Sequence, residues 1–548
     1  MPKRRRGSTT CESDSFSERL SEEDSDLSFS DVPTRRKAPK STRKTRTSFQ
    51  PPKIAENDAS STAPTHSIST HVVAGSEIDE VRMSLLEWYD KVHDVRGMPW
   101  RKRYDPSLGG GGRAQRAYEV WISEIMLQQT QVATVIPYYN RWMAKFPTIA
   151  HLAGSDIETV NGLWKGLGYY SRAARLLKAA QKVVKELDGR LPDNAKDMQA
   201  KIPGVGRYSA GAICSIAYNE CVPVLDGNVH RLLSRFLALY APPKGKQTLD
   251  ILWAGATAFV QNSSRPGDIN QALIELGSTV CKVREPACSE CAISSWCHAY
   301  KRTQGASSQN RTGRDTDIEE SCTLCEPLPA DDREAGLVTI YPMKVERKKA
   351  REELDIVHVI EWRKDYNSQR WFILVRRPEG GLLAGLHEFP TVPAVSDSLS
   401  TCGNDPEIVG KVLFNLFVNP PPPFFKEPNA QEVGCGNKGA LRVAMIKPVG
   451  DVVHVFSHIK KTYRTQWVIL EGGGDKPPEL QNESRLSTVP TREMIEGNGK
   501  DKRRKVSRTS KGGNTNTTPQ WVPLEEVESA NIGTGVMKVW KLTKALWE

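Results

Sequence analysis

The sequence predicts a mostly helical domain followed by a domain of mixed α-helix and β-strand. Over residues 77–300, hydrophobic side chains recur at helical spacing, and glycine and proline interrupt the pattern, which is typical of a series of amphipathic helices. Over residues 351–548 the pattern changes. Residues 357–362 and 371–376 are rich in the β-branched and aromatic side chains typical of strands, and residues 537–547 have the pattern of a closing helix.

The length and charge of the chain set broad limits on its function. The chain has 548 residues, enough for about three or four folded units. It carries 76 Lys and Arg against 65 Asp and Glu, a formal net charge of +11. This charge favours a polyanionic partner, and nucleic acid is the leading candidate. Its longest apolar stretches, such as residues 412–418, are far shorter than the roughly 18 residues that span a membrane, so we expect no transmembrane segment.

The cysteine content indicates a reducing compartment. The chain has 11 cysteines, an odd number, and its N-terminus lacks an apolar leader. Both features argue against a secreted protein with a disulfide framework.

Residues 1–76 form a charged N-terminal tail that we expect to be disordered, because it is rich in Ser, Thr and Pro and poor in aliphatic side chains. The basic clusters at 3–6 and 35–46 are interpreted either as nuclear localisation or phosphate-binding arms, or as a merely solvated tail. The acidic block at 22–26 argues against a mitochondrial transit peptide.

Three further segments are polar, glycine-rich or low in complexity. Residues 301–350 are predicted to connect the two domains, and about 472–518 to form a disordered insertion in the second one. The four glycines at 109–112 predict a flexible loop inside the helical domain.

Four cysteines at the end of the helical domain follow the pattern C-x6-C-x2-C-x5-C, and they are Cys281, Cys288, Cys291 and Cys297. Four clustered soft ligands predict a metal centre over residues 281–297. Structural zinc and an iron–sulfur cluster both accept four cysteines, so the residue types alone leave both open, with unpaired core cysteines as the third alternative.

The segment Ile-Pro-Gly-Val-Gly at residues 202–206 lies between a predicted helix, 194–201, and a second helix that begins at Arg207. We expect a helix-hairpin-helix over about 194–219, in which Gly204, Val205 and Gly206 approach a DNA phosphate. Glycine permits that close approach, and the amides of the following helix N-terminus attract an anion. Taken alone, the segment is equally compatible with an ordinary turn.

Glu124 is the one carboxylate in an otherwise apolar helical segment, residues 120–127. It shares a helix face with Trp121 and with Leu127 or Gln128. If this face lines a pocket, desolvation favours the neutral acid and therefore a proton donor. The alternative is a glutamate that faces solvent.

These motifs, in this order, resemble the MutY family of adenine DNA glycosylases in the endonuclease III superfamily. The resemblance is dense over about residues 80–300 and rests on segments 98–101, 120–130, 166–172, 203–206, 226–228 and the cysteine loop. It implies a [4Fe–4S] cluster on the four cysteines, Glu124 as the catalytic acid, Asp226 as the carboxylate that stabilises the sugar cation, and Asn228 and Tyr208 in the active site. It also implies base or DNA contacts by Trp100, Arg101, Leu127, Gln129 and Tyr169.

The residue after Pro-Gly-Val-Gly-Arg predicts the subclass. In bifunctional glycosylase/lyases of the endonuclease III type this residue is a lysine, whose amine forms a Schiff base with the sugar. Here it is Tyr208, and a phenol cannot form an imine. We therefore expect hydrolytic removal of a base that leaves an abasic site.

The C-terminal domain resembles the Nudix-like domain of MutY in two patches, residues 382–390 and 455–458. The resemblance implies that Phe456, Ser457 and His458 read 8-oxoguanine opposite adenine, and the alternative is a strand-end loop without function. The residues after Pro390 supply no carboxylate cluster for magnesium, so the domain is expected to bind without hydrolysing.

Cys322 and Cys325 lie in the connector, where mammalian relatives carry a zinc site with further cysteines. The upstream cysteine expected there is absent from this chain. Two ligands do not make a structural zinc site, so two spare thiols are the favoured interpretation.

The expected function is base-excision repair of adenine mispaired with 8-oxoguanine or guanine, which prevents G:C to T:A transversions. The expected partner is mispaired duplex DNA bound by a monomer, with sliding-clamp, checkpoint-clamp and mismatch-repair proteins as partners by resemblance, although the sequence shows no convincing clamp-binding peptide. The expected location is the nucleus, with mitochondria as a second site. The rival functions are a bifunctional glycosylase/lyase, disfavoured by Tyr208, and a non-catalytic DNA-binding scaffold, disfavoured by the presence of Glu124 and Asp226.

Overall fold

The computed structural model of the chain describes residues 66–305, 322–328, 337–345, 349–378, 383–393, 406–422, 440–456, 459–481 and 518–548. The chain divides into two compact units. Unit 1 comprises residues up to Arg96 together with Gly206–Lys344, and unit 2 comprises Gly97–Val205 together with Val345–Glu548. The helical region therefore contributes to both units, a division that the order of motifs along the chain did not predict.

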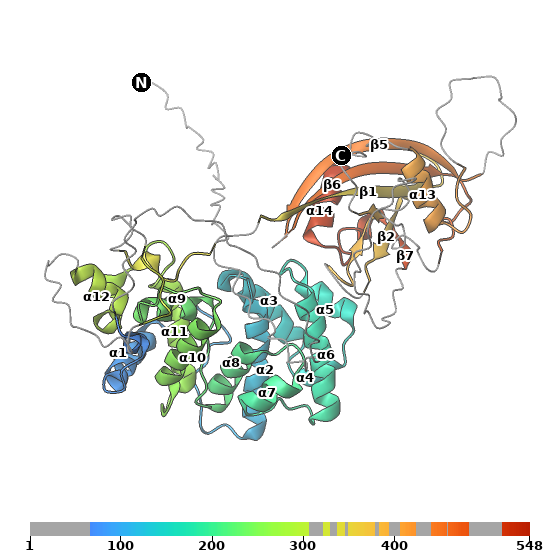
Figure 1. The fold of residues 1–548 in the computed structure, drawn as a ribbon. Coiled ribbons are helices and arrows are strands. Elements are labelled where there is room, and N and C mark those ends of the chain that lie inside the picture. Colours follow the sequence, from blue (N-terminus) through green and yellow to red (C-terminus); the bar gives the residue numbers. More distant parts are fainter. Residues whose placement is uncertain are drawn as a thin grey trace, which may run out of the picture. The chain divides into compact units, whose positions relative to one another are not determined.

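Unit 1 is helical. Its main helices are α1 (Ile78–Val92), α8 (Arg207–Tyr218), α9 (Gly227–Phe236), α10 (Lys246–Val260), α11 (Pro266–Thr279) and α12 (His298–Gly305) (Figure 1). Helices α1, α9, α10 and α11 share one hydrophobic core, which includes Leu85, Leu233, Phe259 and Leu273. Burial of these apolar faces is the main stabilising contribution in a helical unit of this kind.

Three glycines let the helices of unit 1 approach closely. A Cβ at Gly211 would lie 2.5 Å from the carbonyl oxygen of Pro223, and one at Gly277 would lie 2.8 Å from that of Asn228. A Cβ at Gly267 would lie 2.9 Å from Cα of Ile216. Helices α8, α9 and α11 therefore pack backbone against backbone around the segment that carries Asp226 and Asn228.

Unit 2 begins with a second group of helices: α2 (Gly110–Leu127), α3 (Val132–Lys145), α4 (Ile149–Ala153), α5 (Ile157–Trp164), α6 (Ser171–Glu186) and α7 (Ala195–Lys201). Thr148, Asp156 and Asn194 cap the N-termini of α4, α5 and α7 through their side-chain oxygens. The expectation of a loop at residues 109–112 is wrong, because Gly110–Gly112 form the first turn of α2. The first turn continues the long amphipathic pattern that follows it, and this outweighs the low helix propensity of glycine.

The C-terminal part of unit 2 is a mixed seven-stranded sheet. Its strands are β1 (Arg351–Arg363), β2 (Trp371–Arg376), β3 (His387–Glu388), β4 (Thr391–Val392), β5 (Arg442–Val455), β6 (Ile459–Glu471) and β7 (Pro519–Pro523). The main order is β3-β2-β1-β6-β5, with β1 and β6 parallel, while β4 pairs with β1 and β7 with β2. The two predicted strands are confirmed by β1 and β2.

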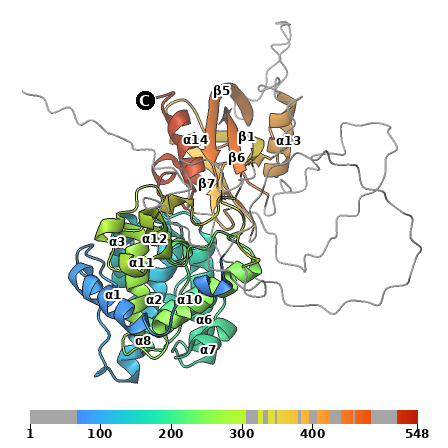
Figure 2. The ribbon, with the colours of Figure 1, turned by 60° about the vertical axis from the view of Figure 1, so that its left-hand side comes forward.

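One helix covers each face of this sheet, as Figure 2 shows with the strands between α13 and α14. Helix α14 (Thr534–Lys544) packs Val539 and Trp540 on the face that carries Val359 and Phe372. Helix α13 (Pro406–Leu416) packs Leu413 and Leu416 on the opposite face. The predicted closing helix is confirmed, although it begins and ends three residues earlier than the expected 537–547.

The structure describes part of each of two segments that were predicted to be disordered. Residues 66–76 are described, and His71 is only 2% exposed within a short 3-10 helix, Ile68–His71. Residues 472–481 are also described, and the Gln481 side chain donates to the carbonyl of Phe417. The remaining parts of these predictions, 1–65 and 482–517, lie outside the described residues, and no described helix is long and apolar enough to cross a membrane.

Candidate active site and metal centres

Glu124 lies on α2, one turn before the end of the helix. Its side chain is 9% exposed, and its neighbours Trp121 and Ile125 are buried as well. Leu127 ends the helix partly exposed, and Gln129 is exposed two residues later. The structure therefore buries the Glu124 side chain near the end of α2 and leaves Leu127 and Gln129 more exposed.

The other predicted base-contact residues of unit 2 differ in exposure. Trp100 is 6% exposed, and its ring meets that of Tyr139 edge-on at 5.2 Å between centroids. Arg101 is partly exposed next to it. Tyr169 is 46% exposed and adopts a left-handed backbone with φ 47°. Trp100 therefore contributes to the core, whereas Tyr169 is available at the surface.

The predicted hairpin is confirmed at its two helices, α7 and α8, which flank residues 202–206. Gly204 has φ +82°, a conformation that favours glycine. Val205 is 5% exposed and anchors the turn. Gly206 is the N-cap of α8 and has no side chain to cap that helix, so the first-turn amides can face an anion, and Tyr208 lies in this first turn.

Asp226 is the N-cap of α9 in unit 1. Its Oδ1 accepts from the amide of Val229 at 2.7 Å, and its Oδ2 accepts from Nδ2 of Asn228 at 2.9 Å. Burial raises the pKa of the Asp226 carboxyl above its usual range, while these two hydrogen bonds and the charge of Arg231 oppose the rise. The carboxylate is thus held in place by donors that favour its ionised form.

Arg231 connects this carboxylate to the cysteine loop, a relationship that the sequence analysis missed. Its Nη2 donates to Oδ1 of Asn228 at 2.9 Å and to the carbonyl of Gly277 at 2.8 Å, and its Nε donates to the carbonyl of Cys281 at 3.1 Å. The only sequence signal is the i, i+3 spacing of Asn228 and Arg231 on one helix face.

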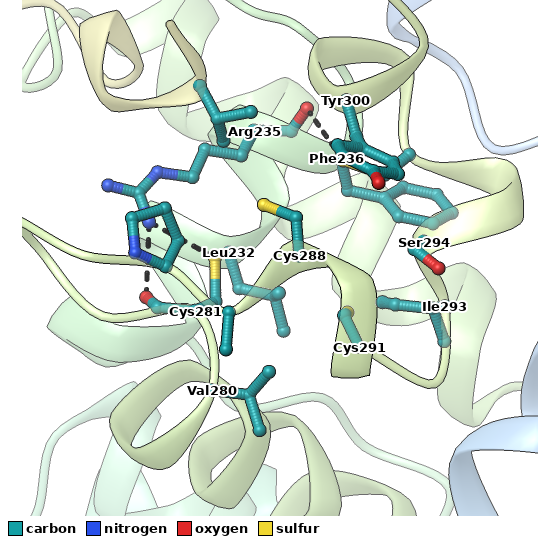
Figure 3. Close-up of a pocket in the computed structure, with 14 residues that line it drawn as sticks. Leu232, Arg235, Phe236, Val280, Cys281, Cys288, Cys291, Ile293, Ser294 and Tyr300 are labelled. Carbon is teal, nitrogen blue, oxygen red and sulfur yellow. Dashed lines mark hydrogen bonds between the residues drawn. The ribbon is translucent and has the colours of Figure 1, made fainter. Parts of the chain in front are cut away.

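Figure 3 labels three of the four predicted cluster ligands around a hollow, namely Cys281, Cys288 and Cys291. Cys297 lines the same hollow. Arg235 lies beside Cys281 and donates from Nη1 to its sulfur and its carbonyl oxygen, each at 3.2 Å. The sequence-predicted metal ligands are therefore brought together, with a buried cation against one sulfur.

The donor set of this hollow fits a metal cluster. Burial raises the pKa of Cys291 to about 12 and that of Cys297 to about 11, so thiolates at neutral pH need a positively charged group between them. Four cysteines that line one hollow are a donor set that a [4Fe–4S] cluster accepts.

A second group of metal-ligating side chains lies in the same unit and consists of His66, His71, Cys322 and Cys325. Their ligand atoms all lie within 4.8 Å of one another. Nε2 of His71 lies 3.5 Å from the sulfur of Cys322 and 3.2 Å from that of Cys325. Two imidazoles and two thiols are a donor set that zinc accepts in tetrahedral sites.

The surroundings of this group also fit a metal. Nδ1 of His71 bonds to the carbonyl of Leu237 at 2.9 Å, which fixes the ring and turns Nε2 toward the two sulfurs. Burial lowers the pKa of His66 to about 4 and lowers that of His71, so both rings are neutral, as ligands must be. The premise of the spare-thiol interpretation, that only two ligands are available, is wrong, because two histidines from the predicted tail complete a set of four donors.

Only part of the predicted 8-oxoguanine-reading loop is described. Phe456 follows β5, its ring meets that of His454 edge-on at 4.6 Å between centroids, and its amide donates to the carbonyl of Ile459 at 2.7 Å. Ser457 and His458 lie outside the described residues.

Comparison with known proteins identifies the family. Residues 122–256 match the family model described as HhH-GPD superfamily base excision DNA repair protein. The adenine DNA glycosylase of Homo sapiens is 42% identical over 72% of this chain and 68% of its own length. That of Rattus norvegicus is 41% identical over 72% of both chains. The chain belongs to the adenine DNA glycosylases.

More distant members agree with this assignment. The adenine DNA glycosylase of Schizosaccharomyces pombe is 34% identical over 74% of this chain and 85% of its own length. Membership makes the chain a DNA glycosylase of base-excision repair and confirms the resemblance drawn from the sequence motifs. It also confirms a helix-hairpin-helix glycosylase fold joined to a Nudix-like sheet domain.

Proposed function

We propose that this adenine DNA glycosylase excises adenine opposite 8-oxoguanine or guanine, leaving an abasic site and so preventing G:C to T:A transversions. The observation that carries the proposal is Glu124, a carboxyl group 9% exposed on an apolar helix face. Adenine stacked in a duplex is out of reach of such a group, so the nucleotide must be flipped out of the helix. Glu124 then donates a proton to adenine, at N7, and makes it a better leaving group.

Asp226 acts on the sugar. As the bond between C1′ and adenine breaks, its electron pair leaves with the protonated base and the sugar becomes an oxocarbenium-like cation. An ionised carboxylate, fixed by Val229 and Asn228, stabilises this positive charge without having to reorganise. Water then adds to C1′, releases a proton and gives the abasic sugar.

Tyr208 favours the hydrolytic outcome over strand cleavage. It occupies the first turn of α8, where the lyases of the superfamily carry their lysine. A phenol cannot form the imine through which a lyase cleaves the strand. The proposed product is therefore an intact strand with an abasic site.

DNA binding is proposed at two surfaces. The hairpin at Gly204–Gly206 is followed by the uncapped first turn of α8. It can bind a DNA phosphate without distinguishing between bases. Gln129 and the exposed Tyr169 are proposed to contact the mispair in unit 2. Phe456, Ser457 and His458 are proposed to read the base opposite adenine, since an aromatic ring and two polar side chains suit stacking and hydrogen bonding to a base edge.

Two metal centres are proposed as structural elements. A [4Fe–4S] cluster fits the hollow lined by Cys281, Cys288, Cys291 and Cys297, and when bound it supplies the positive charge that these buried thiolates need. Zinc fits the donors His66, His71, Cys322 and Cys325. Neither centre is required to move electrons, because base hydrolysis involves no redox step.

The remaining expectations concern location and partners. We propose a nuclear enzyme, supported by the basic clusters at 3–6 and 35–46, with mitochondria as a second location. A solved structure describes the C-terminal domain of mouse MUTYH in complex with human PCNA, and it covers 36% of this chain at 19% identity with a TM-score of 0.22. A sliding clamp is accordingly proposed as a partner, with checkpoint-clamp and mismatch-repair proteins.

A single-turnover assay on duplexes with one 8-oxoguanine·adenine, guanine·adenine or thymine·adenine pair tests the function. Strand breaks should appear only after alkali, and the first duplex should react fastest. Glu124→Gln should lose more than about a hundredfold in rate with mispair affinity retained, because the amide keeps the shape but has no acidic proton. Glu119→Gln, on the same helix, is the matched control. Near-normal cleavage by Glu124→Gln would remove the acid assignment.

A further inference from the structure

Two residues of unit 2, each in a loop next to a helix, have unusual backbone conformations. Gln129, just beyond α2, has φ 55°, and Tyr169, just before α6, has φ 47°. Residues other than glycine rarely adopt this left-handed backbone conformation. Such strained residues persist only where the surrounding structure holds them. Both residues are exposed, and hydrogen bonds hold the peptide group that precedes each of them.

The guanidinium of Arg172 holds the carbonyl group that precedes each of these residues. Its Nη1 donates to the carbonyl of Gln128 at 2.6 Å, and its Nη2 donates to the carbonyl of Gly168 at 3.2 Å. The peptide plane that contains each carbonyl is the plane whose rotation defines φ of the next residue. Holding the two carbonyls therefore constrains φ of Gln129 and of Tyr169 at the same time.

Further contacts make this arrangement rigid. Nη1 of Arg172 also donates to the carbonyls of Ile125 at 2.8 Å and Met126 at 3.2 Å, which lie in the last turn of α2 and lack partners inside the helix. Nη2 donates as well to the carbonyl of Leu167 at 3.3 Å. Glu124 is on the same last turns of α2, so one side chain connects the end of its helix to the loop of Tyr169.

Aromatic rings enclose the guanidinium on the loop side. Its central carbon lies 5.3 Å from the centroid of the Trp164 ring and 5.4 Å from that of Tyr169. Arg172 is 6% exposed, and although burial lowers its pKa to about 10, it stays charged at neutral pH. The indole N–H of Trp164 donates to the carbonyl of Gly168 at 2.9 Å, so this carbonyl receives a second donor. The planar guanidinium can donate to the carbonyls of Gln128 and Gly168 at once, whereas a lysine amine cannot.

We propose that Arg172 is a positioning residue that sets Gln129 and Tyr169 as one unit, so that the surface that contacts the mispair is coupled to the end of the Glu124 helix. The proposal rests on the proposed function for the DNA contacts of these two residues. It predicts that loss of the Arg172 guanidinium changes the preference for 8-oxoguanine over guanine opposite adenine, and does not only lower the stability of the fold.

Hydrogen–deuterium exchange of the DNA-free, full-length protein tests the positioning independently of activity. Arg172→Lys should speed exchange of amides both in residues 127–131 and in residues 166–171, because both carbonyl anchors are lost together. Arg175→Lys, exposed on the same helix, is the matched control and should leave both segments unchanged. Faster exchange in one segment alone, or in neither, overturns the coupling.

A double-mutant cycle tests the functional part. The measured quantity is the ratio of single-turnover rates opposite 8-oxoguanine and opposite guanine. Arg172→Lys should lower this ratio about tenfold, and should lower it little further in a Tyr169→Ala background, because the two changes act through one unit. Equal slowing on both duplexes, or multiplicative effects in the double variant, overturns the proposal.

A milder variant covers the case in which Arg172→Lys does not fold. Trp164→Phe removes the second donor to the Gly168 carbonyl and shortens the ring beside the guanidinium, but it leaves the bonds of Arg172 to the α2 carbonyls. It should therefore lower the ratio less than Arg172→Lys and alter exchange mainly in residues 166–171. An unchanged ratio with Trp164→Phe overturns the proposal. If the wild-type enzyme shows no preference for 8-oxoguanine, the proposed function fails, while the exchange experiment still decides whether Arg172 couples the two segments.

Discussion

Asn228 donates from Nδ2 to Oδ2 of Asp226 at 2.9 Å. The orientation of this amide is not free, because its Oδ1 accepts from Arg231, which has only donors to offer. Arg231 is in turn bonded to the carbonyl of Cys281, the first cysteine of the loop. The position of the carboxylate proposed to stabilise the sugar cation is therefore tied to the cysteine loop through two side chains.

Asn228→Ala should shift the pH dependence of adenine excision. Burial raises the pKa of Asp226, and the bond from Asn228 opposes the rise. The carboxylate must be ionised, so the rate increases as pH rises through this pKa. Removing the donor raises the pKa, so the acid limb, the part of the profile in which the rate rises with pH, moves to higher pH. The rate at neutral pH should fall by about tenfold or more, which corresponds to the usual free energy of a hydrogen bond to a charged group. Single-turnover rates between pH 5 and 8 measure both effects.

A matched control for this variant is Asn194→Ala, which removes an asparagine cap at α7. It should lower the free energy of unfolding by about 1 kcal/mol and leave the acid limb in place. An unshifted limb in Asn228→Ala would remove Asn228 from the positioning of Asp226.

Gly277→Ala should reduce both stability and activity. A Cβ at this position would lie 2.8 Å from the carbonyl oxygen of Asn228, so α11 and the start of α9 must move apart. Overpacking of this kind typically costs about 1–3 kcal/mol, and here it also displaces the residue that holds Asp226. Thermal unfolding and single-turnover rates measure the two effects.

Gly162→Ala is the opposite case. This glycine lies inside α5 with open space where a Cβ would point. Alanine there should raise the free energy of unfolding by about 0.5–1 kcal/mol and leave the rate unchanged. A neutral Gly277→Ala variant would show that the α9–α11 contact tolerates a methyl group.

Much of the fold, and the candidate residues of the site, could be predicted because the signals are local. Glu124 lies within one helical segment, the hairpin within five residues and the four cysteines within 17, so spacing alone brings each set together. The proposed zinc donors could not be found in this way, because His71 and Cys322 are 251 residues apart. Arg172 and Arg231 were missed for a different reason. They bind mainly backbone carbonyls, which every residue carries, so their partners leave no pattern in the sequence.

Tyr208→Lys should convert the enzyme into one that forms a covalent adduct with DNA. The amine would lie in the first turn of α8, where it can attack C1′ of the sugar and form an imine. Borohydride reduction should then trap the adduct, which denaturing electrophoresis detects, while the wild type should give none. Tyr218→Lys, at the far end of the same helix, is the control. Equal trapping by the wild type would refute hydrolysis as the sole reaction.

The proposed zinc site should stabilise unit 1. Metal analysis of purified protein should give about one zinc per chain besides the iron and sulfide of the cluster, because two neutral imidazoles and two thiolates form a closed tetrahedral set. His66→Ala and Cys322→Ser should each lose the zinc but keep the iron.

Loss of a structural metal is among the largest single-residue effects, so the free energy of unfolding should fall by about 3 kcal/mol and Tm by roughly 10 °C. Cys221→Ser, exposed and outside both centres, should change neither metal content nor Tm. Since the ligands join residues 66–71 to residues 322–325, zinc loss should also make these two segments cleavable by protease at a temperature at which they resist in the wild type. Full iron with no zinc, and an unchanged Tm in Cys322→Ser, would show that the four donors assemble without a metal.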